Sequence, residues 1–241
     1  MNNPAAIRLL VTAMADKKLI IADGHHRYET ALKYSKEHQS GANGKSTSGT
    51  QQLPQPEFPE AAVMMTFVNM DSDELVILPT HRVVHGLNGF FATAFFKAAE
   101  AYFTVQALPP FDASAFIEDL KREKGTAFVA VTVAGAFLLR AKPEAMAAAL
   151  ADVPERQRQL DLTQLHSVVF EKLLGLDAEK VREQTNLRYL RDAQEAVELV
   201  RSGEADIAFL TNPVTMEQLK EVAFAGEVMP QKSYRLFSQA A

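Results

Sequence analysis

A short polar run, Asp23-Gly24-His25-His26-Arg27, follows an apolar stretch and has residue types suited to holding an anion. Leu19 to Ala22, just before it, have the pattern of a buried strand, and the residues after it have helical periodicity. This order places three basic side chains in the first turn of a helix, where backbone N–H groups and the helix dipole already attract phosphate or carboxylate groups. Gly24 lets a ligand approach the backbone closely. The sequence therefore predicts an anion site at this turn.

Two other interpretations of these residues stay open. Asp23 is a common N-cap residue type, and His25, His26 and Arg27 would then be a solvated helix start. His25 and Glu29 are four residues apart, a spacing that lets two side chains on one helix face share a metal ion. Adjacent histidines face different sides of a helix, so His25 and His26 are not a zinc pair.

The segment from Asp23 to Leu32 resembles the signature of the DUF1015 family, a widespread prokaryotic family catalogued as a domain of unknown function. This family is related to the free-serine kinases and, more distantly, to the ParB and sulfiredoxin fold. In these relatives, a Gly-x-His-Arg type of turn cradles nucleotide phosphates. Other blocks along nearly the whole chain match the family as well: Met64 to Met70, Leu78 to Arg82, Leu160 to Leu162, Leu165-His166, Ala208 to Pro213 and Met229 to Ser233.

The resemblance implies roles for the residues of the turn. Gly24, His25, His26 and Arg27 are expected to bind the nucleotide phosphates, and Asp23 lies beside the transferring group and helps to hold Mg²⁺. Asp23, His25, His26 and Arg27 form the expected catalytic set. Family members are longer at the N-terminus, where the kinases carry the carboxylate that acts as base, so we expect this chain to be an incomplete phosphotransferase.

Polar residues elsewhere are predicted to join the site. Lys232 and Ser233 match a family block and are expected at the same phosphates, since lysine is a mobile point charge; otherwise they are surface residues. His81 and Arg82 follow a predicted strand, where functional side chains concentrate, although a capped turn with a surface arginine has the same pattern. Asn212 lies at the carboxyl end of another strand, the edge that ligands favour in α/β sheets. Substrate binding is therefore predicted for Glu29, His81, Arg82 and Asn212.

Composition excludes several classes of protein. With 25 basic and 30 acidic residues the formal net charge is −5, which argues against a dominant nucleic-acid or anionic-membrane surface. The chain has no cysteine, so it has no disulfide framework, no Cys-ligated zinc and no sulfiredoxin chemistry. The apolar run from Ile7 to Ala15 is too short to span a membrane, and we expect a cytoplasmic protein.

Periodicity predicts an α/β protein of the mixed α+β kind, with a mixed sheet and flanking helices. Residues 1–109 are expected to form a partial ParB/sulfiredoxin-like portion with a flexible loop at 39–60, and residues 110–241 a C-terminal α/β portion. The expected helices lie at 7–14, 24–37, 90–98, 115–124, 145–150, 161–175, 192–203 and 215–223. The expected strands lie at 19–22, 61–70, 75–78, 102–108, 126–133, 136–141, 187–190 and 206–210, with 61–70 and 75–78 as a hairpin. Capping pairs are expected at the starts of three helices, from Asp161 and Gln164, Asp192 and Glu195, and Thr215 and Gln218. The strands at 126–133 and 136–141 are expected to form a hairpin that turns near Gly135. His166 on the 161–175 helix is expected to be a packing residue.

These observations favour a nucleotide-binding phosphotransferase-like protein. ATP or ADP and Mg²⁺ are the expected cofactors, and the acceptor is free serine or another small hydroxyl-bearing metabolite. The alternative is a non-catalytic module that binds a nucleotide or another anion, and a plain interaction domain is the third interpretation. Neither nucleic acid nor membrane is expected as a partner, and the sequence does not indicate an oligomeric state.

Overall fold

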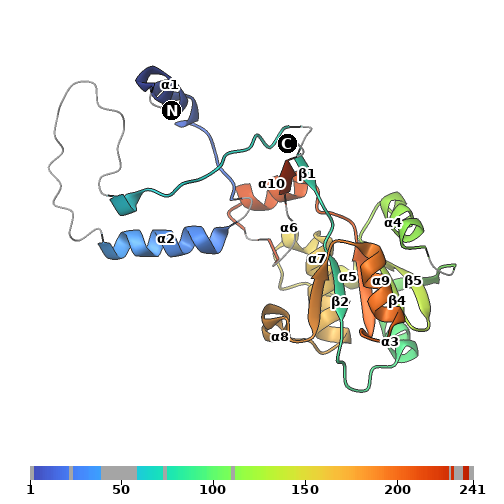
Figure 1. Cartoon of the computed structure of the whole chain (residues 1–241). Helices are drawn as coiled ribbons and strands as arrows, with labels where there is room; N and C mark the ends of the chain where they lie inside the picture. The colour runs from blue at the N-terminus through green and yellow to red at the C-terminus, as the bar shows by residue number, and fades with distance from the viewer. Residues whose placement is uncertain are drawn as a thin grey trace. The chain divides into compact units, whose positions relative to one another are not determined.

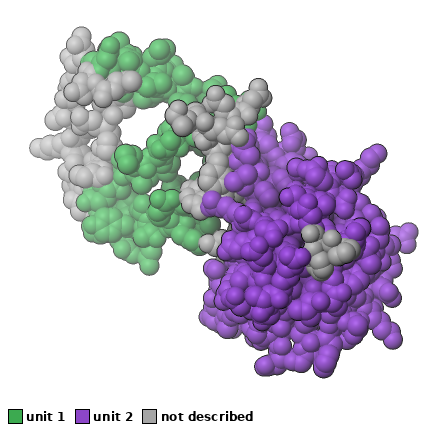
Figure 2. Space-filling view, turned by 45° about the vertical axis from the view of Figure 1, so that its right-hand side comes forward, with its two compact units in different colours: residues 1–72 green, residues 73–241 purple. Residues whose placement is uncertain are grey.

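The computed structural model describes residues 3–21, 24–38, 59–72, 75–109, 112–227, 229–230 and 236–238. The chain divides into two compact units, unit 1 over residues 1–72 and unit 2 over residues 73–241 (Figure 2). No helix within the described ranges combines the length and the apolar character needed to cross a membrane.

The described residues of unit 1 form two helices and a short turn of 3-10 helix. Helix α1 spans Pro4–Met14, and the Asn3 side chain caps it by accepting hydrogen bonds from the amides of Ala5 and Ala6. Helix α2 spans His25–His38, and η2 spans Pro59–Ala61. Both predicted helices are confirmed. Neither α1 nor α2 contains a buried residue, so the polar start of α2 lies at the surface of the protein.

Two strands predicted in unit 1 are not formed in its described residues. Residues 19–21 lie outside any strand, and so do residues 61–72. The predicted hairpin between 61–70 and 75–78 is therefore wrong, because the second of these segments pairs elsewhere. Strand β1, Leu75–Ile77, is antiparallel to β8, Leu236–Ser238, at the other end of the chain.

A six-stranded sheet forms the centre of unit 2 (Figure 1). Its order is β3-β5-β4-β7-β2-β6, and every pair is antiparallel. The α and β fold class is thus confirmed, with the difference that this sheet has no parallel pair. The strands are β2 His81–Val84, β3 Phe103–Ala107, β4 Ala127–Thr132, β5 Gly135–Ala141, β6 Leu187–Leu190 and β7 Ile207–Thr211.

Helices cover both faces of this sheet. The helices of unit 2 in its described residues are α3 Ala92–Ala99, α4 Ala113–Arg122, α5 Pro143–Ala149, α6 Glu155–Arg158, α7 Asp161–Gln164, α8 Ala178–Glu183, α9 Ala193–Arg201 and α10 Met216–Phe224. A π-helical segment, η3, continues α7 over Leu165–Leu173. The short helix α6, the helix α8 and the strand β8 have no counterpart among the predicted elements.

Alternation along the strands separates two cores. Val84, Phe128 and Phe209 point into one core, which the aromatic residues of α3 and the apolar residues of η3 complete. Their chain neighbours Val83 and Ala208 point into the other, which α4 and α9 cover. Strands β4 and β7 are buried along their whole length, as expected for central strands covered on both faces.

One predicted capping pair is wrong. Asp161 and Gln164 were expected to form a capping box, but Leu160 is the N-cap of α7 and makes no side-chain cap. The Asp161 carboxylate instead accepts a hydrogen bond of 2.7 Å from the Thr126 hydroxyl. The Gln164 amide donates to the Arg158 carbonyl oxygen at 2.9 Å. Both side chains thus have partners outside α7.

The predicted division of the chain after residue 109 stays a prediction, as does the ParB/sulfiredoxin-like character of the first part. Strands β2 and β3 precede residue 109 and belong to the same sheet as β4 to β7. Most of the predicted loop at 39–60, namely 39–58, lies outside the described residues.

Candidate functional site

Helix α2 is preceded by a glycine in the left-handed region of backbone conformation. Gly24 has φ +82°, and its carbonyl oxygen accepts the first helical hydrogen bond from the Tyr28 amide at 2.9 Å. The amides of the first turn have no partner within the helix itself. Among the described residues, no group accepts a hydrogen bond from the backbone amide of His25 or His26. This turn can therefore present N–H groups to a ligand.

The Arg27 side chain folds back over Gly24. A Cβ atom added at Gly24 would lie 2.8 Å from Arg27 Nη2 and 2.9 Å from Nε, closer than real Cβ contacts. Glycine is thus needed here for two reasons: the positive φ and the space that the guanidinium occupies. The fold brings a planar five-donor cation to the positive end of the helix dipole, an arrangement that favours an anion.

The two histidines extend the basic surface. The rings of His25 and His26 lie 4.0 Å apart between centroids, tilted by 47°. His26 Nδ1 is 3.4 Å from Glu29 Oε2. The metal-sharing alternative requires Glu29 to lie beside His25, but its carboxylate approaches His26. No group of three potential metal ligands occurs among the described residues.

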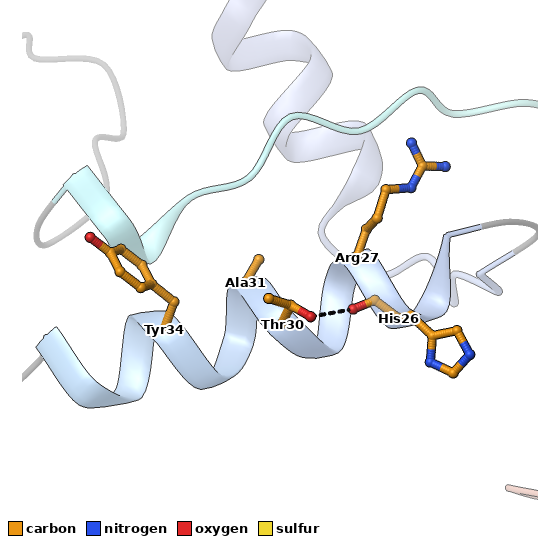
Figure 3. A pocket seen from close by; sticks show the side chains of 5 residues that line it. All are labelled: His26, Arg27, Thr30, Ala31 and Tyr34. Atoms are coloured by element: carbon orange, nitrogen blue, oxygen red, sulfur yellow. Dashed lines mark hydrogen bonds between the residues drawn. The ribbon is translucent and has the colours of Figure 1, made fainter.

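A shallow hollow of about 480 Å³ lies along one side of α2. Its lining consists of His26, Arg27, Thr30, Ala31 and Tyr34. Figure 3 shows Arg27, Ala31 and Tyr34 projecting to the same side of the helix, as residues spaced by three and four do. The Thr30 hydroxyl donates to the His26 carbonyl oxygen at 2.8 Å and is fixed against the helix.

In unit 2, His81 and Arg82 occupy an unexpected place. They begin the buried strand β2 and do not follow a strand into a loop as predicted. Arg82 is fully buried, donates a hydrogen bond from Nη1 to the Thr80 carbonyl oxygen, and lies opposite Tyr189 of β6 in the strand register. Its guanidinium carbon is 5.7 Å from the centroid of the Tyr189 ring, a cation–π contact.

Burial determines the protonation of this region. Desolvation lowers the pKa of Arg82 to about 10, still well above neutral pH. Desolvation, and then the positive charge of Arg82, lower the pKa of His81 to about 4 and that of His166 to about 3. Both histidines are therefore neutral at pH 7 beside one positive charge. His81 Nδ1 accepts a hydrogen bond from the Thr211 amide at 3.3 Å.

Asn212 has a partner within the protein. Its side-chain amide donates to the carbonyl oxygen of Leu120, at the end of α4, at 2.9 Å. The hydrogen bond joins the end of β7 to α4 and fixes the side chain.

The sequence matches the family described as "Protein of unknown function (DUF1015)" over residues 1–198. The chain belongs to this family. No curated protein matches it.

Solved structures similar to this DUF1015 chain include a conserved hypothetical protein from Pyrococcus furiosus, with 15% identity and a TM-score of 0.41. That match covers 71% of this chain and 60% of the Pyrococcus protein, so the chain spans less than two thirds of that protein's length. A variant of a free serine kinase in complex with AMP has 16% identity, a TM-score of 0.48 and coverage of 98% of this chain and 81% of the kinase. A variant in complex with ADP has 16% identity and a TM-score of 0.47, with 98% and 82% covered.

The structure of this DUF1015 member brings part of the predicted site together. Gly24 immediately precedes α2, and His25, His26, Arg27 and Glu29 lie on the first two turns of the helix. Asp23, Lys232 and Ser233 lie outside the described residues. His81, Arg82 and Asn212 belong to unit 2.

Sequence reasoning missed Tyr189 and treated His166 as a packing residue. Tyr189 could not be recognised from its own segment, because its importance comes from the cross-strand position opposite Arg82. The Leu165-His166 block was the available signal for His166.

Proposed function

We propose that this DUF1015 chain binds the phosphates of a nucleotide at the start of α2 and belongs to a phosphotransferase that acts on a small hydroxyl-bearing metabolite, with free serine as the leading candidate. The observation that carries the proposal is the packing of the Arg27 guanidinium against Gly24 at the helix N-terminus. The family resemblance of this turn to phosphate-binding turns of kinases supports the same ligand.

The geometry suits phosphate for physical reasons. A phosphate oxygen placed at the first turn would meet the amides of His25 and His26 and the forked donors of Arg27, and charge-assisted bonds of this kind are the strong ones. Phosphoryl transfer depends mainly on positioning and charge neutralisation. The proposed role of the turn is therefore to orient the phosphates and to stabilise their negative charge.

The hollow beside the turn gives the rest of the nucleotide a place. Arg27 and Tyr34 are seven residues apart, which corresponds to about 10 Å along an α-helix. Phosphates at Arg27 would leave a sugar and base to lie over Ala31 and the exposed ring of Tyr34. Aromatic rings stack on bases in a sequence-tolerant way, so Tyr34 is the proposed contact for the base.

The described residues fit the nucleotide phosphates better than they fit a metal ion. Helix α2 has no acidic residue in its first turn, and Glu29 lies against His26. Mg²⁺ held with the help of Asp23 remains part of the proposal that rests on the sequence alone. When bound, Mg²⁺ would neutralise phosphate charge.

Isothermal titration with ADP and ATP tests the proposal. Arg27→Ala should weaken nucleotide binding by about 10-fold or more, the effect of losing a charge-assisted contact. Lys33→Ala is the matched control, because it removes one positive charge from the exposed face of the same helix, where Lys33 pairs with Glu37 at 4.0 Å. Equal affinities of the wild type and Arg27→Ala would remove the proposed role.

A non-catalytic nucleotide-binding module is the second candidate, favoured by the absence of an acidic residue in the first turn of α2. The two functions differ in turnover. ³¹P NMR of the protein with ATP, Mg²⁺ and L-serine would show a new phosphomonoester signal for a kinase and none for a binding module. Arg27→Ala serves as the control for transfer at this site.

A further inference from the structure

Three polar side chains from three different elements converge beneath the surface of unit 2. Arg82 comes from β2, Tyr189 from the edge strand β6 directly opposite, and His166 from the π-helix η3. The His166 ring lies 5.1 Å from that of Phe170, and the Phe170 ring lies 5.8 Å from that of Phe209, the other cross-strand neighbour of Arg82. The three side chains therefore line the same face of the sheet.

Two of these side chains have polar atoms that the described residues leave unsatisfied. Neither His166 Nε2 nor Tyr189 Oη, both buried atoms, has a hydrogen-bond partner among the described residues. A buried polar group left in this state costs free energy, so native proteins rarely keep one without a reason. Both can donate a hydrogen bond, and both adjoin the cation of Arg82.

The helix that supplies His166 is unusual. Segment η3 is π-helical over nine residues, Leu165–Leu173. π-Helical turns are rare and occur often at functional sites, because they displace a side chain from its regular helical position. His166 lies in the first turn of this segment, so the irregular backbone helps to aim its imidazole at the face that holds Arg82.

We propose that Arg82, His166 and Tyr189 form a binding site for the carboxylate group of a small organic acid. The guanidinium is the planar partner that fits a carboxylate, and the imidazole and phenol supply two further donors. His166 and Tyr189 are partly exposed, whereas Arg82 is fully buried. A ligand would therefore approach from the side of His166 and Tyr189.

Charge favours a carboxylate over a phosphate. At neutral pH Arg82 is charged, and burial keeps His166 neutral. A carboxylate brings one negative charge to this buried site, whereas a phosphate dianion brings two. Burying the second charge is unfavourable, so the carboxylate is favoured.

The test follows the His166 imidazole by NMR during titration with sodium acetate and with L-serine, using His166→Gln to assign the signal. A saturable shift is expected with both carboxylates and none with acetamide, the uncharged analogue of acetate. Absence of a saturable shift with acetate and L-serine would overturn the proposal. Tighter binding of inorganic phosphate than of acetate would overturn the assignment to a carboxylate.

Tyr189→Phe is the variant of choice, because it removes one hydroxyl and keeps the ring under Arg82, whereas loss of the buried Arg82 endangers folding. Acetate affinity should fall by about 10-fold, the value for a hydrogen bond to a charged group. Tyr102→Phe changes another half-buried tyrosine of unit 2 and should leave acetate affinity unchanged. Acetate affinity of Tyr189→Phe equal to that of the wild type would refute the site. Arg27→Ala should not alter acetate binding, so this test is independent of the nucleotide proposal.

Discussion

Gly24→Ala tests whether nucleotide binding requires a glycine before α2 because the missing side chain leaves space for the Arg27 guanidinium. The substitution has two effects: it places a side chain in the left-handed region at φ +82°, and it puts a Cβ atom 2.8 Å from Arg27 Nη2. Left-handed conformation costs an L-residue about 1 to 2 kcal/mol. The close contact must move the flexible guanidinium away from the helix N-terminus.

Gly203→Ala separates these two effects. Gly203 has nearly the same φ, +80°, but a Cβ atom there would meet nothing within 4 Å. Each variant should therefore lower the unfolding free energy of its own unit, unit 1 for Gly24 and unit 2 for Gly203, by about 1 to 2 kcal/mol. Only Gly24→Ala should also lose nucleotide affinity, by about 10-fold if its effect equals the loss of the Arg27 contact.

The assay is calorimetric titration with ADP for each single variant and for the double variant Gly24→Ala/Arg27→Ala. If glycine acts through Arg27, the double variant should bind ADP no more weakly than Arg27→Ala, since effects on one shared contact are not additive. ADP binding by Gly24→Ala at wild-type affinity would contradict the reasoning. An equal loss of affinity in Gly203→Ala would contradict it too.

The remaining predictions concern the stability of unit 2. Asn212→Ala should lower the unfolding free energy measured with urea by about 1 kcal/mol, because the Leu120 carbonyl oxygen loses its donor, whereas Asn88→Ala at an exposed turn should have no effect. Lowering the pH from 7 to 5 should destabilise the unit. The folded-state pKa values of about 4 for His81 and about 3 for His166 lie below the ordinary histidine value of 6.5, so the unfolded chain binds more protons in this range. The stabilising contribution of the two histidines is complete above pH 6.5 and decreases as the pH is lowered. At pH 5 the loss reaches up to about 2 kcal/mol per histidine. His166→Gln should flatten this dependence, and an unchanged slope in urea titrations would show that His166 is not held neutral by burial.

Local signals in the sequence predicted the elements that local chemistry determines. Asp192 caps α9 by accepting from the amides of Gln194 and Glu195, and Thr215 forms a capping box with Gln218 at the start of α10. Gly135, with φ +135°, follows the turn between β4 and β5. Each of these features involves residues within a few positions of one another, so a short window of sequence is enough to recognise it.

Features that depend on distant residues could not be predicted in this way. Strand β2 begins with His81 and Arg82, which look like a polar strand end, and it becomes a central strand only because β6 and β7 flank it. The opposite error occurred at 61–70, where apolar residues indicate a strand but the described segment forms none. Asp161 had the spacing of a cap, but Thr126 occupies its carboxylate. Of the candidate site, only the cluster on α2 was accessible from spacing, whereas the meeting of Arg82, His166 and Tyr189 follows from the order of the strands.

The ladder between β1 and β8 has a consequence for how unit 2 is put together. Leu75 is paired with Ser238 and Ile77 with Leu236, so the first and last described strands of the unit are bonded neighbours. Domains whose ends adjoin can be circularly permuted, with the old ends linked and new ends opened at an exposed turn. The exposed turn at Val133 and Ala134 offers such an opening. We therefore expect unit 2 to keep its fold when β1 and β8 are linked and the chain is opened at this turn.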